Sequence, residues 1–296
     1  MNGSARSLPD PAAASRAVAY MIVGAMLLTS QDAITKWLLQ WHGVGEVMFW
    51  RGLLSLPMIG ALVWFEGGRD LLRSRNPKVN LLRAFFALLT SVLVVVSFHF
   101  MPLADALAVI FVNPLLLTAL SIPLLGEKVG WRRWLAVGFG FAGVLAITRP
   151  GFEGGAGLAV LIPLSAALFA ALRDITTRKL GGQDSATTVM LYTMLVATVG
   201  GALSLPFEAS WPSGTSLAWL VFAALLLTAS HWFTIGALHL AEAGLVAPFK
   251  YLSLVWAAVL GFLVWDDVPD LWKVAGAALI VASSLYTAHR EARRRI

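Results

Sequence analysis

Long apolar stretches alternate with short polar connections along the whole chain. Stretches of about twenty apolar residues predict helices that cross a hydrocarbon core of about 30 Å. Ten such stretches cover residues 17–39, 44–66, 79–100, 104–125, 132–149, 156–180, 186–207, 217–240, 244–266 and 270–289. Lipid offers the backbone no hydrogen-bond partners, and the alternating pattern of barrel strands is absent. We therefore expect an all-α membrane protein with ten transmembrane helices.

Two short segments of the sequence each have a similar counterpart later in the chain. Residues 30–36 (SQDAITK) resemble residues 172–178 (LRDITTR), and residues 103–106 (LADA) resemble residues 240–243 (LAEA). Each copy holds five predicted spans, an odd number, so the two copies must be inverted about the membrane plane. Internal repeats of this kind are typical of transporters with a site at the repeat interface. We expect two inverted five-helix repeats, 17–150 and 151–289, around a central cavity.

Composition and charge placement support a membrane location. The chain is 58% hydrophobic and 13% charged, with a mean hydropathy of +0.78, and we expect no soluble domain and no cleavable signal peptide. Basic residues gather in alternate connections and in the C-terminal tail, at Arg69, Arg73, Arg75, Lys78, Lys128, Arg132, Arg133, Arg178, Lys179, Arg290, Arg293, Arg294 and Arg295. The positive-inside rule then places both tails, 1–16 and 290–296, in the cytoplasm of a bacterial inner membrane. The net charge of +6 is a topological signal and implies no nucleic-acid partner.

The repeated motifs resemble a known family. Residues 103–106 open the fourth span, Gly126–Glu127 close it before Trp131, and residues 241–243 to Asp266 show the same layout. This arrangement resembles the EamA-type drug/metabolite transporter superfamily, with the nearest likeness to the bacterial YddG-type aromatic amino-acid exporters. The resemblance implies a basket of helices in which spans three, four, eight and nine line a central cavity, spans one and six help to gate it, and export is the direction. It implies no cofactor.

Charged residues within the apolar stretches are the candidate gates. Asp32 and Arg51 lie at similar predicted depth, so we expect an ion pair between them, with Lys36 as a competitor. This pair locks spans one and two or serves gating and proton coupling, and the sequence leaves both open. In the second repeat Thr193 replaces Arg51, so Asp174 needs Arg178 or Arg173. Gating is therefore assigned to two unequal groups: Asp32, Arg51 and Lys36, and Arg173 and Asp174.

Span nine supplies the candidate substrate site. Lys250 follows Pro248 in span nine, and Asn113–Pro114 occupies a comparable place in span four. Proline removes a backbone donor and bends a helix, and bent helices at a repeat interface commonly form transport sites. Lys250 is a candidate partner of a substrate carboxylate; alternatively, it pairs with Glu242. The predicted site adds aromatic and polar residues that could line an apolar cavity: His231, Trp232, Tyr251, Phe111, Asn113, Thr90, Ser91 and Phe98.

The sequence favours a carrier over other membrane functions. It contains neither a G-x-S-x-G elbow nor an H-E-x-x-H pair, which argues against an intramembrane enzyme. Its polar positions are too few for a channel lining, and no histidine pair or cysteine suggests a metal site. We expect an exporter of amino acids, preferentially aromatic ones; other small metabolites or lipophilic drugs are the alternative. Gly138, Gly140, Gly143 and Gly276 could allow close helix contacts, within a monomer or across a weak homodimer.

Overall fold

The described part of the chain is entirely helical. The computed structural model describes residues 11–66, 68, 72–126, 131–149, 157–180, 184–208, 211–241 and 243–294, and these contain helices and turns but no strand. Its elements are α1 (Pro11–Leu38), α2 (Val44–Glu66), α3 (Pro77–Phe100), α4 (Leu103–Ile110), α5 (Asn113–Leu125), α6 (Trp131–Thr148), η2 (Gly157–Val160), α7 (Leu161–Leu180), α8 (Ala186–Ala202), α9 (Leu205–Glu208), α10 (Gly214–Leu240), α11 (Ala243–Val246), η3 (Ala247–Tyr251), α12 (Leu252–Trp265) and α13 (Leu271–Arg294). The predicted all-α class is confirmed. Most of the predicted tail 1–16, the loop residues Arg69 and Lys128, and Glu127 lie outside the described residues.

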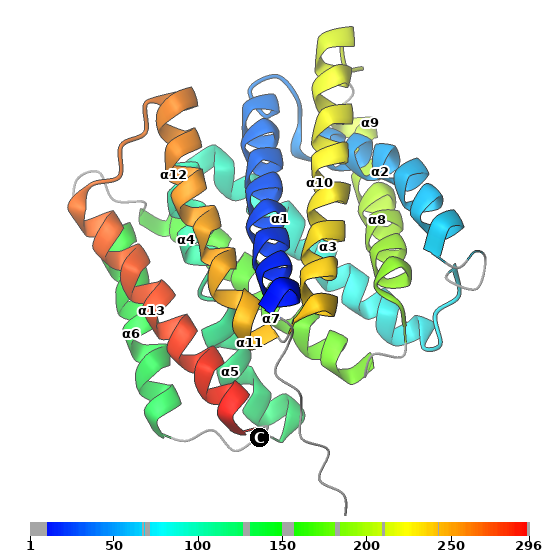
Figure 1. Cartoon of the computed structure of the whole chain (residues 1–296). Coiled ribbons are helices and arrows are strands. Elements are labelled where there is room, and N and C mark those ends of the chain that lie inside the picture. Colours follow the sequence, from blue (N-terminus) through cyan, green and yellow to red (C-terminus); the bar gives the residue numbers. More distant parts are fainter. Residues whose placement is uncertain are drawn as a thin grey trace, which may run out of the picture.

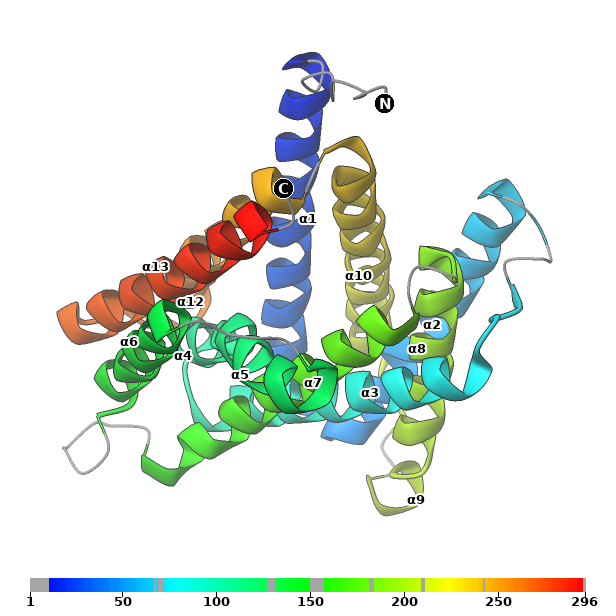
Figure 2. The ribbon, with the colours of Figure 1, turned by 90° about the horizontal axis from the view of Figure 1, so that it is seen from below.

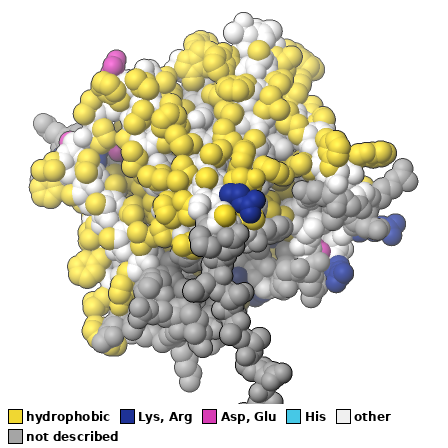
Figure 3. Space-filling view, viewed as in Figure 1, with side chains coloured by type: hydrophobic (Ala, Val, Ile, Leu, Met, Phe, Trp, Pro, Cys, Tyr) yellow, Lys and Arg dark blue, Asp and Glu magenta, His cyan; other side chains and the backbone are white. Residues whose placement is uncertain are grey.

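Eight helical segments in the described ranges are long and apolar enough to cross a membrane. They are Ala12–Leu38, Val44–Phe65, Pro77–Phe100, Leu103–Leu125, Gly157–Lys179, Ala186–Phe207, Gly214–Leu238 and Pro248–Trp265. Shorter apolar helices, Trp134–Ile147 and Leu271–Tyr286, occupy the other two predicted positions. Hydrophobic side chains cover most of the described surface on the face shown in Figure 3. The chain is therefore a multi-pass membrane protein, and the number of ten spans stays a prediction.

Local sequence signals set several helix ends. Asn76 precedes Pro77, and its side chain accepts a hydrogen bond from the Val79 backbone N–H at 3.4 Å. Ser185 caps α8 in the same way, accepting from the Thr188 N–H at 3.0 Å. Gly126 ends α5 in the left-handed conformation with φ 70°. These contacts satisfy backbone groups that a helix end leaves without partners.

The helices pack in pairs that join distant parts of the chain. The main pairs are α1 with α10, α3 with α7, α2 with α8, and α6 with α13. Figure 1 shows α1 and α10 between the α6–α13 pair on the left and the α2–α8 pair on the right. Figure 2, turned by 90°, shows the α3–α7 pair in a different part of the bundle from α1 and α10. Each pair joins one predicted repeat to the other.

Two glycines let α6 and α13 touch through their backbones. A Cβ atom added to Gly143 would lie 2.7 Å from the carbonyl oxygen of Gly276, and one added to Gly276 would lie 2.6 Å from the carbonyl oxygen of Gly143. Both distances are shorter than real Cβ contacts allow, so only glycine fits at either position. This predicted close contact is therefore made within one chain.

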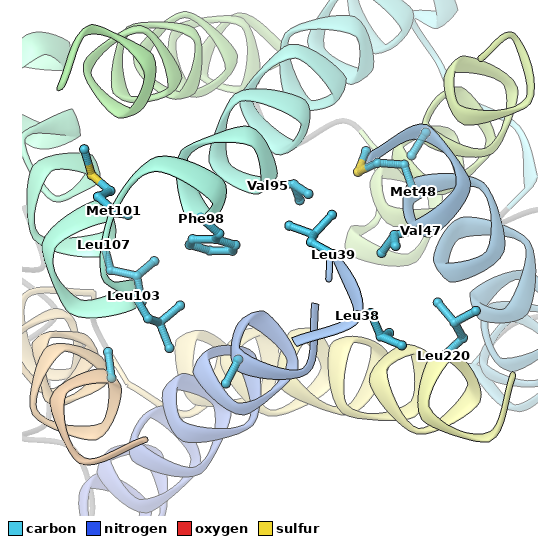
Figure 4. Close-up of a cluster of buried hydrophobic side chains, with 14 residues drawn as sticks. Leu38, Leu39, Val47, Met48, Val95, Phe98, Met101, Leu103, Leu107 and Leu220 are labelled. Atoms are coloured by element: carbon cyan, nitrogen blue, oxygen red, sulfur yellow. The ribbon is translucent and has the colours of Figure 1, made fainter. Parts of the chain in front are cut away.

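An apolar cluster fills one end of the bundle, where α1 and α3 end and where α2, α4 and α10 begin (Figure 4). Its large buried members are Leu38, Leu39, Val47, Met48, Val95, Phe98, Met101, Leu103, Leu107 and Leu220. We call this the Lys36 end. At the opposite end the Asp184 carboxylate accepts hydrogen bonds from the Arg75 backbone N–H at 2.7 Å and from Asn80 Nδ2 at 3.0 Å. We call that the Asp184 end.

Candidate functional site

Two interrupted helices meet inside the bundle. The predicted fourth span is broken between α4 and α5 at Phe111 and Val112, just before Pro114. The predicted ninth span is broken by η3, which contains Pro248. The Phe111 ring, at the first break, and the Tyr251 ring, at the second, have centroids 4.8 Å apart. The interruptions that the prolines predict therefore lie against each other.

An acidic side chain joins α7 to the first of these breaks. Arg173 Nη2 lies 2.8 Å from Asp174 Oδ1, and Arg173 Nε donates to the same oxygen at 2.9 Å. The other oxygen, Asp174 Oδ2, accepts a hydrogen bond from Asn113 Nδ2 at 3.0 Å. Of the two partners that the sequence left open for Asp174, the structure thus provides Arg173.

Lys250 lies beside this pair without joining it. Its ammonium is within Coulomb range of both Arg173 and Asp174, yet no ion pair within 4.0 Å forms between Lys250 and any described carboxylate. Its side chain is exposed although η3 lies within a membrane-crossing segment. Glu242, the alternative partner, lies outside the described residues. Lys250 therefore carries an exposed positive charge in a segment that is apolar enough to cross the membrane.

Arg83 is a further cation that we did not predict. It extends from α3 and donates to Thr177 Oγ1 at 3.1 Å and to Thr193 Oγ1 at 2.8 Å, within Coulomb range of Arg173 and Asp174. Thr193 stands where the first repeat has Arg51, so α3 supplies a cation that span seven lacks. Its position inside the stretch 79–100 was the available sequence signal.

Asp32 and Arg51 form a looser pair than predicted. Their charges are within Coulomb range, but no contact within 4.0 Å joins these two described residues. The Arg51 guanidinium instead donates to Met48 Sδ at 3.3 Å, one turn earlier in α2, and Arg51 is 8% exposed. His231 is within Coulomb range of Arg51, Arg173 and Lys250. We call Asp32, Arg51, Arg83, Arg173, Asp174 and Lys250 the charge cluster.

The other predicted site residues divide into two sets. The Thr90 hydroxyl donates a hydrogen bond to the Phe86 carbonyl oxygen at 2.8 Å. Ser91 is half-buried on the same helix. Phe98 is 3% exposed within the apolar cluster at the Lys36 end. Trp232 is 43% exposed and packs on Tyr20 and Phe233, with centroids 5.9 and 5.1 Å away. The structure brings Lys250, Tyr251, Phe111, Asn113 and His231 together and places Phe98 and Trp232 in other surroundings.

Ion pairs cross the Lys36 end. Lys36 Nζ donates to the Met101 carbonyl at 3.0 Å, lies 3.9 Å from Asp267 Oδ2, and stands 4.9 Å above the Trp265 ring. We name these contacts, together with two further ion pairs, the Lys36 lock. The further pairs are Lys273 with Asp105, at 2.6 Å, and Arg149 with Asp270. The lock joins α1, α4 and α6 to the end of α12 and the start of α13. Lys36 is therefore part of this lock, and no ion pair joins it to Asp32 in the described part of the chain.

The chain is similar to a family of transporters, to several bacterial transporters and to a solved structure. The sequence model of the EamA-like transporter family matches residues 15–149 and again residues 157–288. A riboflavin transporter of Rhizobium johnstonii is 28% identical, covering 96% of this chain and 95% of its own length. A riboflavin transporter of Vibrio cholerae is 32% identical, with coverages of 82% and 80%. An S-adenosylmethionine uptake transporter of Rickettsia felis is 25% identical, with coverages of 93% and 92%. One solved crystal structure shares the fold, with a TM-score of 0.60 at 19% identity over 95% of this chain and 98% of the other.

Proposed function

Because the chain belongs to the EamA-like transporter family, we propose that it carries a small metabolite with a carboxylate and a planar ring across the bacterial inner membrane by alternating access. The observation that carries this proposal is the exposed ammonium of Lys250 beside the Arg173–Asp174 pair, where no described carboxylate forms an ion pair with it. Aromatic amino acids, the cargo class predicted from the sequence, fit this description, and export is the proposed direction.

The balance of charge in the cluster favours an anionic group on the cargo. Four cations, Arg51, Arg83, Arg173 and Lys250, stand against two carboxylates, Asp32 and Asp174. Charges inside a bilayer cost about 2.5 to 3.5 kcal/mol each on insertion scales unless water or a partner meets them. A substrate carboxylate beside Lys250 would supply the missing negative charge.

The proposal that the cargo contains a planar ring rests on the aromatic residues at the two helix interruptions. Phe111 and Tyr251 contact each other, two residues before Asn113 and one residue after Lys250 in the chain, so the aromatic pair and the cation belong to the same two breaks. Riboflavin and S-adenosylmethionine, named for the relatives, both contain a planar heteroaromatic ring. These names do not support the narrower likeness to YddG-type exporters, so aromatic amino acids are one group of ring-bearing carboxylates among those to be tested.

Several observations support inverted repeats. The family model matches twice, and exchanging the two predicted repeats turns the α1–α10 pair into the α7–α3 pair while it leaves α2–α8 and α6–α13 as pairs. The contact between Gly143 and Gly276 is likewise reciprocal. Such halves can exchange conformations and so open one central site to either side.

The orientation follows from the basic residues. Arg75, Lys78 and Lys179 are exposed near the Asp184 end, which the positive-inside rule assigns to the cytoplasm together with both termini. The Lys36 end is then the outer end. Because the apolar cluster and the Lys36 lock join the helices at that end, we infer that Lys250 is reached from the cytoplasm and that the conformation is inward-open.

Transport in liposomes tests the proposal. Purified protein is reconstituted, and fluxes of phenylalanine, threonine and phenethylamine are measured in both directions. Threonine lacks the ring, and phenethylamine lacks the carboxylate, so phenylalanine should be preferred over both. Riboflavin and S-adenosylmethionine are measured in parallel, since the relatives carry them.

The variant K250M tests the carboxylate partner directly. A charge-assisted hydrogen bond contributes about 1.5 to 3 kcal/mol, so kcat/KM for phenylalanine should fall at least about tenfold. The control K179M removes an exposed lysine at the end of α7 and should leave transport unchanged. Unchanged affinity for the carboxylate in K250M, or no flux of any carboxylate with the parent protein, contradicts the proposal.

A further inference from the structure

Lys250 and Asn113 occupy matching positions in the two repeats. The motifs at residues 103–106 and 240–243 are 137 positions apart, and the same offset carries Asn113 to Lys250. The repeated segments at 30–36 and 172–178 likewise match Asp32 to Asp174. The contact between Asn113 and Asp174 therefore has a counterpart, which is a contact between Lys250 and Asp32.

Only one of these two equivalent contacts is formed. Asn113 Nδ2 donates to Asp174 Oδ2 at 3.0 Å. Lys250 makes no ion pair with Asp32 among the described contacts, and its electrostatic neighbours are Arg173 and Asp174. The backbones nevertheless adjoin, because α1 packs against η3 much as α7 packs against α5. The contact between side chains is thus formed between α7 and α5 and is not formed between the equivalent elements α1 and η3.

An inverted repeat turns this difference into a statement about the other conformation. When the transporter opens to the opposite side, each half takes up the arrangement that the other half has in the first state. We propose that Asp32 is a positioning residue that pairs with Lys250 in the outward-open state and so displaces the substrate carboxylate from the ammonium. This inference rests on the inverted repeats and the Lys250 site of the proposed function.

The exchange of partners solves a problem of buried charge. An ammonium within the membrane needs a counter-charge in every state. In the inward-open state water solvates the ammonium until the incoming carboxylate supplies the counter-charge. In the outward-open state Asp32 takes its place, so the cargo leaves without stranding the lysine, and the empty carrier returns with Lys250 paired. Asn113, which is uncharged, cannot play this part for Asp174, which already has Arg173.

Variants of Asp32 separate binding from release. D32N should bind phenylalanine from the inner side with a dissociation constant within about twofold of the parent value, whereas its net efflux should fall about tenfold because the carboxylate is displaced more slowly. D32E should retain efflux. D266N removes an exposed carboxylate in the connection between α12 and α13 and should change neither quantity. Parent-like efflux in D32N would overturn the proposal. Loss of binding in K250M is read separately, because it tests the Lys250 site and not its exchange of partners.

Cross-linking tests the geometry without relying on activity. The chain has no cysteine, so D32C/K250C contains the only two thiols, which a short bifunctional thiol reagent can join. The variant K273M breaks an ion pair of the Lys36 lock and should populate the outward-open state. Cross-linking of the thiol pair should then rise about fivefold in the K273M background. If labelling of a single L39C variant shows that K273M opens the outer end while cross-linking stays the same, the proposal is wrong.

Discussion

At the scale of single residues, the charged side chains within the helices differ in how fully they are paired. Asp174 is bound by Arg173 and Asn113, and Arg83 donates to two threonine hydroxyls. Lys250 makes no such contact with any residue that the structure describes, and its side chain is exposed. Since an unpaired charge is costly in hydrocarbon, the proposed function assigns Lys250 a place beside water and the cargo.

Asp270 gives a prediction about pH. It lies between α12 and α13, outside the helices, where the Lys273 backbone N–H and the Arg149 side chain hold the pKa of its carboxyl below the ordinary value. A lowered pKa means that the ion pair with Arg149 is complete above the ordinary pKa and is lost only as the pH falls through the lowered one. The ratio of D270N to parent transport rates should therefore stay constant between about pH 5 and 8. A ratio that varies more than about twofold over that range contradicts it.

The sequence drew attention to these charged residues, but it did not reveal which residues they contact. Lys250, Arg173 and Asp174 were identified because a charge inside an apolar stretch needs a reason. Depth alone placed Asp32 opposite Arg51, and depth fixes a level along a helix but not the direction in which a side chain points. Arg51 turns to Met48 in its own helix, which only packing determines.

At the scale of elements, the interruptions and the glycine contact give the bundle its shape. The breaks beside Pro114 and Pro248 follow from the missing proline N–H and were predictable. The 3₁₀ conformation of η3 was not, because it depends on how α1 packs against that segment. Apolar length also failed to distinguish α6 and α13, whose apolar parts are shorter than those of the eight other segments.

Alanine substitutions on α6 test the glycine contact. G143A should destabilise the protein by about 1 to 3 kcal/mol, because its new Cβ would overlap the Gly276 carbonyl and the two helices must separate. G138A is the matched control on the same helix, where a Cβ meets nothing within 4 Å, and it should be neutral or slightly stabilising. Thermal unfolding of the detergent-solubilised variants measures both. Equal stabilities would show that the contact carries no constraint.

At the scale of the whole molecule, one end is held by both apolar packing and charge. The apolar cluster and the Lys36 lock combine residues from both predicted repeats. The acidic connection at Asp266, Asp267 and Asp270 was visible in the sequence, but its partners lie far away in the chain and could not be assigned from spacing. The lock is therefore a feature that only the fold reveals.

Lys36 is the member of the lock that makes the most varied contacts, with a carbonyl, a carboxylate and an indole ring. K36M removes all three and, in the proposed orientation, should shift the population towards the outward-open state. In right-side-out vesicles, labelling of L107C by a membrane-impermeant maleimide should become about tenfold faster. K78M, at an exposed site near the Asp184 end, is the control, and labelling equally slow in both variants would show that the lock does not hold the outer end closed.

The backbone contact between Gly143 and Gly276 has a consequence for the motion itself. Both helices are the last of the predicted repeats, and at this point their backbones meet, with the Ile147 and Ile280 side chains beside the two glycines. Since neither glycine has a side chain that could rearrange to absorb a shift, this crossing is suited to be the stationary axis about which the two proposed halves turn. It would then provide an internal reference point, where distances stay fixed while those at both ends of the bundle change.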